Sequence, residues 1–309
     1  MVKLPNPRRM YERARWLRSD GKPSFKTAIH EREPEIRSLL VTEVPVVSPQ
    51  TPLIRCVEEM SRARFRAAVV VKAGELSGIV TFHDIADYLG GGWRHRIVVE
   101  RYGDNIYKAL AVPVRELMSG SVVYASTSDT LSRVLELMVT YGYGLIPVLD
   151  SGGRLAGAVT EGSVVKLYSG RVGVKPAGDY MTKNVITAGE ESPLVDVLKL
   201  MVSTGVRRIP LTASDGRVRG VVTWRSVIDF VGSHRIFSAS KSGSVSEALS
   251  VEAVSLADRD AIVVEPSTPL ESLVREMLER NLDYGLVAEG GVLRGIITER
   301  DIMYAVLGS

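Results

Sequence analysis

One short motif recurs four times along the chain and constrains its fold more than any other feature. It consists of glycine, two apolar residues and threonine, and it stands at GIVT (78–81), GAVT (157–160), GVVT (220–223) and GIIT (295–298). A leucine precedes the four threonines by 28, 29, 29 and 28 residues, and a methionine follows each leucine by seven. Since seven residues make about two helical turns, each leucine and methionine lie on one helix face. The chain is therefore a repeat protein.

Each copy predicts the order strand, helix, strand, strand, helix over about 55 residues. The predicted first strands are the apolar pairs Val46-Val47, Val122-Val123, Val185-Ile186 and Ile262-Val263. A second spacing is measured from the residue that lies thirteen positions before each threonine. This residue is eight positions after the methionine in copies 1 and 4 (Ala68, Gly285) and nine positions after it in copies 2 and 3 (Pro147, Pro210). Copies 1 and 4 thus share one register, and copies 2 and 3 another. A unit this small buries too little surface to stand alone comfortably, so we expect the copies to pair.

The residue three after the threonine divides the copies differently. It is aspartate at GIVTFHD (78–84) and GIITERD (295–301), and serine at positions 163 and 226. Threonine followed by an acid at this spacing is close to a capping box, and the acid also suits the positive end of the helix dipole. Capping does not explain why aspartate stands there rather than glutamate. A short carboxylate at a helix start can also accept hydrogen bonds from the two vicinal hydroxyls of a ribose. The residues alone leave both interpretations open.

The whole pattern from about residue 36 to 309 resembles the CBS domain, the repeat named after cystathionine β-synthase. The resemblance implies an α/β fold in which four β-α-β-β-α repeats pair into two pseudo-two-fold Bateman modules that bind adenosine ligands in a central cleft. The implied division is a basic N-terminal extension (1–35), module 1 with repeats 1 and 2 (36–173), and module 2 with repeats 3 and 4 (174–309). A monomeric disk or a homodimer is expected.

The resemblance also implies two ribose sites, one in each module. The expected ligand-binding residues are Thr81 and Asp84 with Thr298 and Asp301 for the ribose, Ile79 and Ile296 for the purine, and Arg66 and Arg208 for phosphates. Repeats 2 and 3 lack the aspartate, so we expect their sites to be empty or weak. His83, Trp224 and Arg300 lie inside the same motifs and are expected at the surface.

Composition and residue spacing limit the kinds of function that the chain is expected to have. Cys56 is the one cysteine, which favours a reducing cytoplasm, and the four histidines show no metal-ligand spacing. Neither a signal peptide nor a membrane span is expected, since the N-terminus is polar and the apolar runs are short. Few amide residues among many Arg and Glu suggest a thermophile. No catalytic constellation stands out, so we expect a protein that is not an enzyme.

Residues 1–35 carry nine Lys and Arg against five Asp and Glu, a charge of +4 beside a net +3 for the chain. Two functions follow. The first is a regulatory sensor that binds AMP, ADP, ATP or S-adenosylmethionine, needs no catalytic cofactor and acts on a protein partner. The second is a nucleic-acid-binding or scaffold protein that contacts RNA or DNA through the basic extension. An amphipathic N-terminal helix packed on the body would explain the same charge without a nucleic acid.

Overall fold

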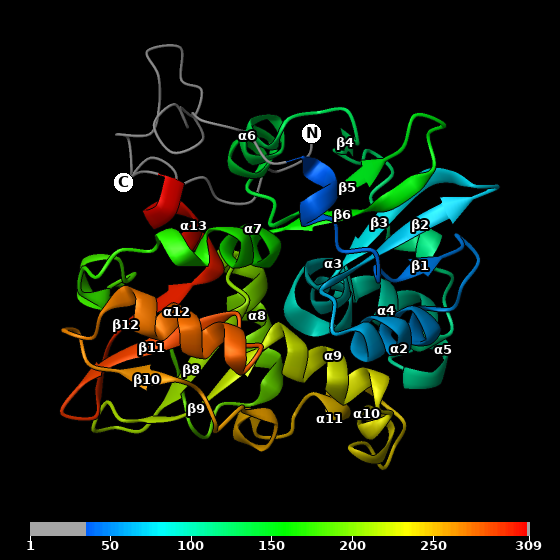
Figure 1. Ribbon diagram of the computed structural model, residues 1–309. Helices are drawn as coiled ribbons and strands as arrows, with labels where there is room; N and C mark the ends of the chain where they lie inside the picture. The colour runs from blue at the N-terminus through cyan, green and yellow to red at the C-terminus, as the bar shows by residue number, and fades with distance from the viewer. Residues whose placement is uncertain (1–34, 308–309) are drawn as a thin grey trace. The chain divides into compact units, whose positions relative to one another are not determined.

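The computed structural model describes residues 35–307, and in this range each repeat forms its own three-stranded sheet (Figure 1). A two-residue strand pairs in parallel with the middle strand, which pairs antiparallel with the strand that ends in the Gly-apolar-apolar-Thr motif. The strands are β1 (Val46–Val47), β2 (Ala67–Lys72), β3 (Glu75–Thr81), β4 (Ala125–Ser126), β5 (Leu145–Leu149), β6 (Leu155–Thr160), β7 (Ala188–Gly189), β8 (Arg208–Thr212), β9 (Val218–Thr223), β10 (Val263–Val264), β11 (Tyr284–Glu289) and β12 (Val292–Thr298).

Two helices accompany each sheet, one between the first two strands and one after the third. The first set is α2 (Leu53–Ala63), α6 (Leu131–Tyr141), α8 (Leu194–Thr204) and α12 (Leu270–Glu279). The second set is α3 (Phe82–Ala86) with the π-helical turn η3 (Asp87–Gly91), α7 (Glu161–Tyr168) with η5 (Ser169–Arg171), α9 (Trp224–Gly232) and α13 (Glu299–Leu307). The connections hold α4 (His95–Tyr102), α5 (Ile106–Leu110), α10 (Arg235–Ser238) and α11 (Val245–Ala248). Short 3-10 turns precede the repeats: η2 (Ile36–Leu39), η4 (Val114–Glu116), η6 (Ala177–Asp179) and η7 (Ala253–Leu256).

The predicted α/β fold of four repeats is confirmed, and the leucine–methionine face of every first helix is buried. Two of the predicted first strands are misplaced. In repeats 2 and 3 the strand begins at Ala125 and Ala188, three residues after the predicted valines, because the parallel register sets these alanines opposite Val148 and Leu211. Of the predicted 1–35 extension, residues 1–34 lie outside the described range.

Hairpin length explains the two registers seen in the sequence. Two residues connect the last two strands in repeats 1 and 4 (73–74 and 290–291), and five connect them in repeats 2 and 3 (150–154 and 213–217). The motif threonine therefore pairs with a residue 14 positions earlier in one pair of repeats and 15 earlier in the other. The structural counterparts of Pro147 and Pro210 are consequently Val69 and Leu286, one residue beyond the alanine and glycine found by counting.

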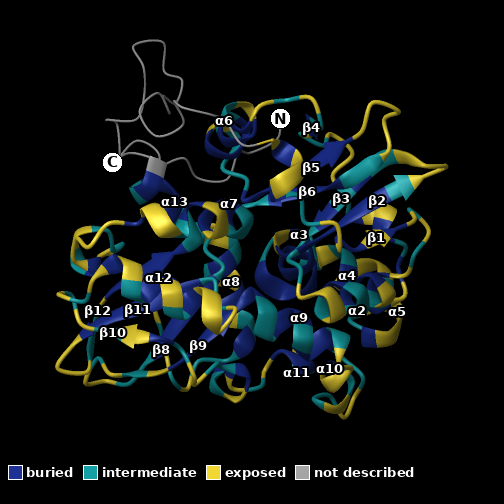
Figure 2. Cartoon of the chain, in the orientation of Figure 1, coloured by how far each residue is buried: buried dark blue, intermediate teal, exposed yellow. Residues whose placement is uncertain are grey.

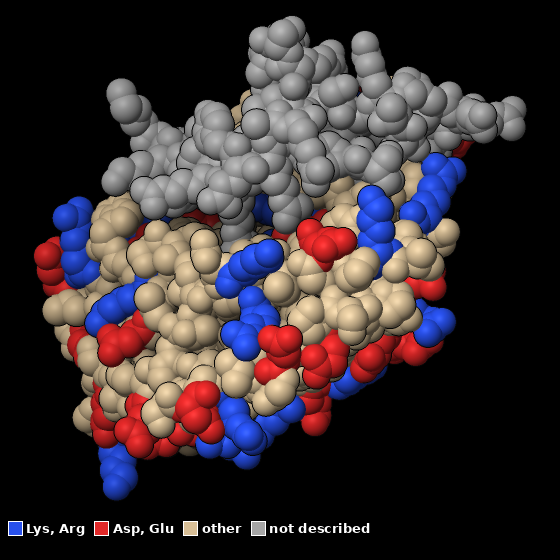
Figure 3. All heavy atoms as spheres, turned by 90° about the vertical axis from the view of Figure 1, so that its left-hand side faces the viewer, with Lys and Arg blue, Asp and Glu red and all other residues tan. Residues whose placement is uncertain are grey.

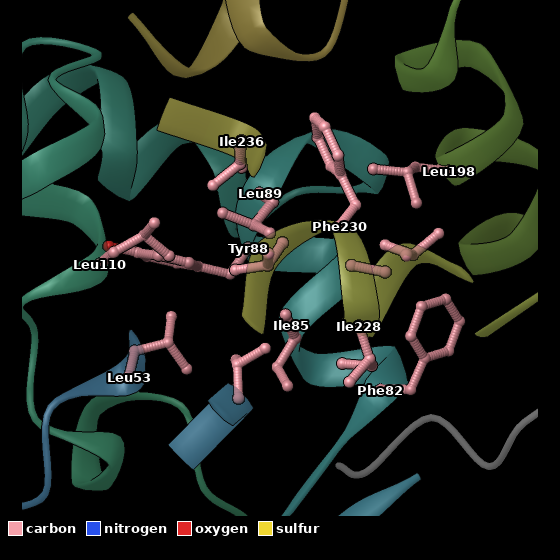
Figure 4. Packing of buried hydrophobic residues seen from close by; sticks show 14 of the residues in the cluster. Leu53, Phe82, Ile85, Tyr88, Leu89, Leu110, Leu198, Ile228, Phe230 and Ile236 are labelled. Carbon is pink, nitrogen blue, oxygen red and sulfur yellow. The ribbon is translucent and has the colours of Figure 1, made fainter. Parts of the chain in front are cut away.

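The described residues form two compact units. One contains repeats 1 and 3 (43–122 and 186–260), and the other contains repeats 2 and 4 with the residues before repeat 1 (up to 42, 123–185 and from 261). Each unit has its own hydrophobic core, and Figure 2 shows buried residues along the strands and inner helix faces. In the first unit Leu53 and Ile85 of repeat 1 join Leu198 and Ile228 of repeat 3 in one cluster (Figure 4). The predicted grouping into 36–173 and 174–309 concerns ligand-binding pairs and stays a prediction.

A crossing segment covers the motif glycine of every sheet. The segment before repeat 2 bridges to repeat 1 at Ile79 and Ser119, and the segment before repeat 1 bridges to repeat 2 at Val41 and Ala158. Repeats 3 and 4 exchange segments in the same reciprocal way, through the Asp258–Val221 and Thr182–Ile296 bridges. A Cβ on Gly78 would lie 2.8 Å from the Met118 sulfur and 3.0 Å from the Ser119 carbonyl oxygen. The glycine is thus required because the crossing chain lies where a side chain would be.

Replacing Gly78 by alanine should destabilise the protein by about 1–3 kcal/mol, since the crossing segment must move to admit a methyl group. Gly120 is the matched control, because nothing lies within 4 Å of a Cβ added there. Urea unfolding followed by circular dichroism would measure both variants. Equal midpoints for Gly78→Ala and Gly120→Ala would contradict the packing argument.

Candidate functional site

All four second helices begin at the motif threonine, at the end of the third strand. In repeats 1, 2 and 3 the threonine hydroxyl accepts the backbone N–H three residues later, and the side chain at that later position accepts the threonine N–H. This is the reciprocal capping box that the sequence predicted. In repeat 4 the Thr298 N–H likewise donates to the Asp301 carboxylate, at 2.9 Å. Capping is therefore common to aspartate and serine.

The serine repeats use their third residue entirely within the cap. The hydroxyls of Ser163 and Ser226 accept the threonine N–H at 3.0 and 2.9 Å. Each hydroxyl also donates to the carbonyl oxygen of the same threonine, at 2.9 Å. A serine cap thus turns its polar group back onto the backbone of its own helix start.

The aspartate repeats differ because a carboxylate has two oxygens. Oδ2 of Asp84 accepts from the Thr81 N–H at 2.9 Å and from the Thr81 hydroxyl at 2.7 Å, and Asp301 repeats both distances with Thr298. Capping therefore occupies Oδ2 and leaves Oδ1 to bind a group from outside the cap. Both aspartates are buried, with 9% and 5% of their surface exposed. A hydrogen bond to Oδ1 is therefore weakly screened by water and is stronger than one at the surface.

The crossing segments bring further groups to the two helix starts. In repeat 4 the Thr182 hydroxyl lies 3.3 Å from Oδ1 of Asp301, and Thr182 bridges the strand at Ile296. In repeat 1 Ser119 occupies the corresponding place opposite Ile79. Ile79 is half-buried and Ile296 is buried. The structure thus sets each predicted isoleucine two residues before its threonine, beside a crossing segment.

The predicted arginines are not structural equivalents. Arg66 precedes β2, and its carbonyl oxygen accepts the Phe82 N–H at 2.8 Å. The same bond in repeat 3, from Trp224 to a carbonyl at 2.8 Å, ends on Arg207. Arg208 lies one position further, paired with Thr223 and buried. The longer hairpin of repeat 3 shifts the count by one, which is why counting back from the threonine set Arg208 rather than its neighbour Arg207 opposite Arg66.

Arg66 lies in the same repeat as Thr81 and Asp84, next to the helix start. Arg208 lies in the compact unit of repeats 1 and 3, whereas Thr298 and Asp301 lie in the unit of repeats 2 and 4. A role of Arg208 at the Asp301 site therefore stays a prediction.

Two of the three residues expected at the surface are not there. His83 is exposed, as expected, but Trp224 is 4% exposed and packs in the core of its unit. Arg300 donates through Nε to Glu161 at 2.6 Å and through a terminal nitrogen to the Gly142 carbonyl at 2.8 Å. Burial lowers the pKa of Arg300, but the Glu161 charge opposes it and the net pKa is raised above its ordinary value. The sequence did not indicate this contact of Arg300, because its partner Glu161 lies 139 positions away, in repeat 2.

The sequence reading also missed Asp87 and Arg94, which meet at the helix start of repeat 1. Arg94 lies 2.9 Å from Oδ1 of Asp84, and its Nε lies 3.6 Å from Oδ2 of Asp87. Asp84 and Asp87 are three residues apart, the spacing that sets two side chains on one helix face. The three glycines before Trp93 were the available signal that this loop approaches the helix closely.

Two further findings concern metal ligation and thiol reactivity in the described part of the chain. No cluster of three His, Cys, Asp or Glu that could hold a metal occurs among the described residues. Burial raises the pKa of the Cys56 thiol to about 12, so little thiolate forms at neutral pH. No helix between residues 35 and 307 is long and apolar enough to cross a bilayer.

Charges of both signs are interspersed on the face shown in Figure 3. The nucleic-acid alternative depended on the basic extension, whose residues 1–34 lie outside the described range. It therefore stays a prediction.

Comparisons with known proteins agree with this organisation. A family model described as the CBS domain matches residues 36–91, 114–170, 177–233 and 251–308. The chain is 29% identical to the uncharacterised protein MJ1225 of Methanocaldococcus jannaschii, over 84% of this chain and 94% of that one. It is also 29% identical to a 33.4 kDa protein in the ribosomal RNA operon of Thermofilum pendens, over 84% and 86%. The crystal structure of MJ1225, described as a proposed archaeal homologue of g-AMPK, matches with a TM-score of 0.80 over 87% of this chain and 98% of that one, at 27% identity.

Replacing Arg300 by methionine should destabilise the protein by about 3 kcal/mol, because it removes the cation from the buried Glu161 carboxylate. The double variant Arg300→Met/Glu161→Gln should lose less, since the Glu161 charge is removed together with its cation. Arg294→Met is the matched control, because its ion pair with Glu289 is exposed and contributes at most about 1 kcal/mol. Denaturant unfolding would compare the three, and equal losses in Arg300→Met and Arg294→Met would show the buried pair to be dispensable.

Proposed function

Because the chain belongs to the CBS-domain family, with four such domains along residues 36–308, we propose that it is a regulatory sensor of an adenosine ligand such as AMP, ADP, ATP or S-adenosylmethionine. The observation that carries the proposal is that the two carboxylate oxygens of Asp84, and likewise those of Asp301, have different roles. One oxygen of each carboxylate caps its helix, and the other is directed beyond the cap. The serines of repeats 2 and 3 have a single side-chain oxygen, which is used within the cap.

Ribose recognition suits this geometry chemically. A buried carboxylate oxygen accepts charge-assisted hydrogen bonds from the 2′ and 3′ hydroxyls, and these are shorter and stronger than bonds between neutral groups. The fixed helix start holds the oxygen in place, so little side-chain entropy is lost on binding. In this proposal Thr81 and Thr298 orient the carboxylates, and Ile79 and Ile296 offer apolar surface to the purine.

The phosphate contacts are proposed by charge and position. Arg66 lies beside the helix start of repeat 1, and the hairpin register adds Arg207 to the predicted Arg208 in repeat 3. Guanidinium groups bind phosphate oxygens in a bidentate manner, which favours a nucleotide over S-adenosylmethionine.

Regulation is the proposed output. The similarity to a proposed homologue of g-AMPK supports this role, as does a chain made of CBS domains over most of its length. A ligand can shift a conformational equilibrium only by its differential affinity for two states. The reciprocal crossing segments supply a structural basis, because each site then includes residues that precede a different repeat.

The proposal also includes a protein partner, no catalytic activity, a cytoplasmic location, a thermophilic source, and a monomeric disk or homodimer.

Ligand-stripped protein should bind AMP at two sites, and Asp84→Ala and Asp301→Ala should each remove one. The 2′-deoxy analogue should bind at least about tenfold more weakly, the loss expected when a hydrogen bond to a charged group is removed. Asp301→Glu is the sharper variant, because glutamate can complete a capping box and keep the helix while it displaces the acceptor oxygen. Isothermal titration would measure stoichiometry and affinity, with S-adenosylmethionine tested alongside.

Ser226→Ala serves as the control, since it removes a cap at the same position of repeat 3 without removing a carboxylate. If Asp301→Glu binds like the wild type, the carboxylates are caps and no more. Binding of S-adenosylmethionine without AMP would redirect the proposal from nucleotides to that ligand.

A further inference from the structure

In repeat 1 the second oxygen of the carboxylate is already bound by a cation from the same chain. A terminal nitrogen of Arg94 donates to Oδ1 of Asp84 at 2.9 Å and to the Leu117 carbonyl oxygen at 3.0 Å. Leu117 immediately precedes the segment that crosses the sheet at Ser119. One guanidinium therefore joins the helix start to the crossing segment, at the oxygen that a ribose would need.

Arg94 is held in this place from two further directions. Its backbone N–H donates to Oδ1 of Asp87 at 3.1 Å, and its Nε lies 3.6 Å from the other oxygen of that carboxylate. Asp87 is 5% exposed, and the Arg94 side chain is 23% exposed. An arginine between two buried carboxylates is screened less than a surface ion pair, so its attraction for Asp84 is stronger.

The glycines before Arg94 explain how the loop reaches this position. A Cβ on Gly91 would lie 2.8 Å from the Leu198 carbonyl oxygen and 2.9 Å from that of Ala86. A Cβ on Gly92 would collide with the Asp87 carboxylate. The chain can therefore leave the π-helical turn η3 and bring Arg94 back over Asp84 only if these positions lack side chains.

Repeat 4 presents a different group to its carboxylate. Oδ1 of Asp301 accepts from the Thr182 hydroxyl at 3.3 Å, a longer bond from a neutral donor. Arg300, one position before Asp301, donates to Glu161 and the Gly142 carbonyl, and the Asp301 charge also contributes to its raised pKa. At Asp84, by contrast, a guanidinium nitrogen lies directly on Oδ1, and a ribose hydroxyl must displace this charged donor to bind there.

We infer that Arg94 competes with the ribose hydroxyls for Asp84. This inference rests on the proposed function. Binding at Asp84 requires Arg94 to leave that carboxylate, and the same movement breaks its bond to the Leu117 carbonyl. Occupancy of the Asp84 site is thereby coupled to release of the crossing segment before repeat 2.

The test measures the Asp84 site alone, by titrating AMP into an Asp301→Ala background. Arg94→Met should tighten AMP binding by about five- to tenfold, the effect of removing a competing partly exposed ion pair. The gain should be absent with 2′-deoxy-AMP, because the freed oxygen acts on the ribose hydroxyls. Arg96→Met is the matched control: it removes the same charge two residues away, and the Arg96 guanidinium lies over the Trp93 ring.

Unchanged or weaker AMP binding in Arg94→Met would overturn the inference, and weaker binding would show that Arg94 contacts the ligand. Appearance of binding in Arg94→Met where Asp301→Ala alone binds no AMP would support it most strongly. Should Arg94→Met not fold by circular dichroism, Arg94→Lys replaces it. Lysine cannot reach Asp84, Asp87 and the Leu117 carbonyl with one planar group, so at least about a twofold gain is expected, and no gain would again overturn the inference.

The same data separate this inference from the proposed function. If the unmodified protein and every variant fail to bind an adenosine ligand, the proposed function and the inference both fail. If the unmodified protein binds AMP but Arg94→Met binds it no more tightly in the Asp301→Ala background, only the inference fails.

Discussion

The close crossing of one chain segment over each motif glycine is the constraint on which the site depends. At Gly78 the Met118 sulfur and the Ser119 carbonyl occupy the space of a Cβ, and the crossing fixes where β3 ends and where the next helix begins. It also delivers a hydroxyl or a carbonyl to the helix start: Thr182 to Asp301, and Leu117 through Arg94 to Asp84. Without the glycine, neither carboxylate would have these partners.

The proposal of a ligand site beyond the cap is based on the number of acceptor atoms at each helix start. A serine satisfies its cap by donating and accepting within one helix start, as Ser163 does with Thr160. An aspartate satisfies the same cap with one oxygen and retains a second, buried one. A buried carboxylate is costly without strong partners, so a chain that needed only a cap would be better served by serine. Two repeats of this chain have serine, and the other two keep the charge.

Much of the fold could be predicted from the sequence because the same pattern occurs four times, so an element that is ambiguous in one repeat can be assigned from the others. Four leucine–methionine pairs and four threonines in register fix the helices and the last strand, whereas a two-residue first strand has no pattern of its own and was misplaced at Ala125 and Ala188. The longer hairpin changes the pairing register of the last two strands by one residue. The motif spacing in the sequence shows this difference but does not show that the hairpin causes it. That ambiguity hid the equivalence of Arg66 and Arg207.

The parts of the site that escaped prediction are those that occur once. Arg94 comes from the connection after repeat 1, and its position depends on a π-helical turn and on glycines that admit no side chain. The partner of Arg300 lies in repeat 2, and only the packing of α7 against α13 brings the two together. Repeats specify a shared framework; the differences between the sites come from residues that break the repetition.

These residues also connect the helix start of one repeat to a neighbouring repeat of the same compact unit. Arg300 stands one position before Asp301 and is bound to Glu161, the first residue of α7, so the helix starts of repeats 4 and 2 move together or lose a buried ion pair. At repeat 1, the helix that contains Asp84 continues into η3, which packs against α8 of repeat 3. In both compact units, an aspartate-bearing helix start is thus mechanically joined to a repeat whose own helix start carries serine. In the proposed function, a ligand bound by the carboxylate of one repeat would therefore also act on the serine-bearing repeat packed against it.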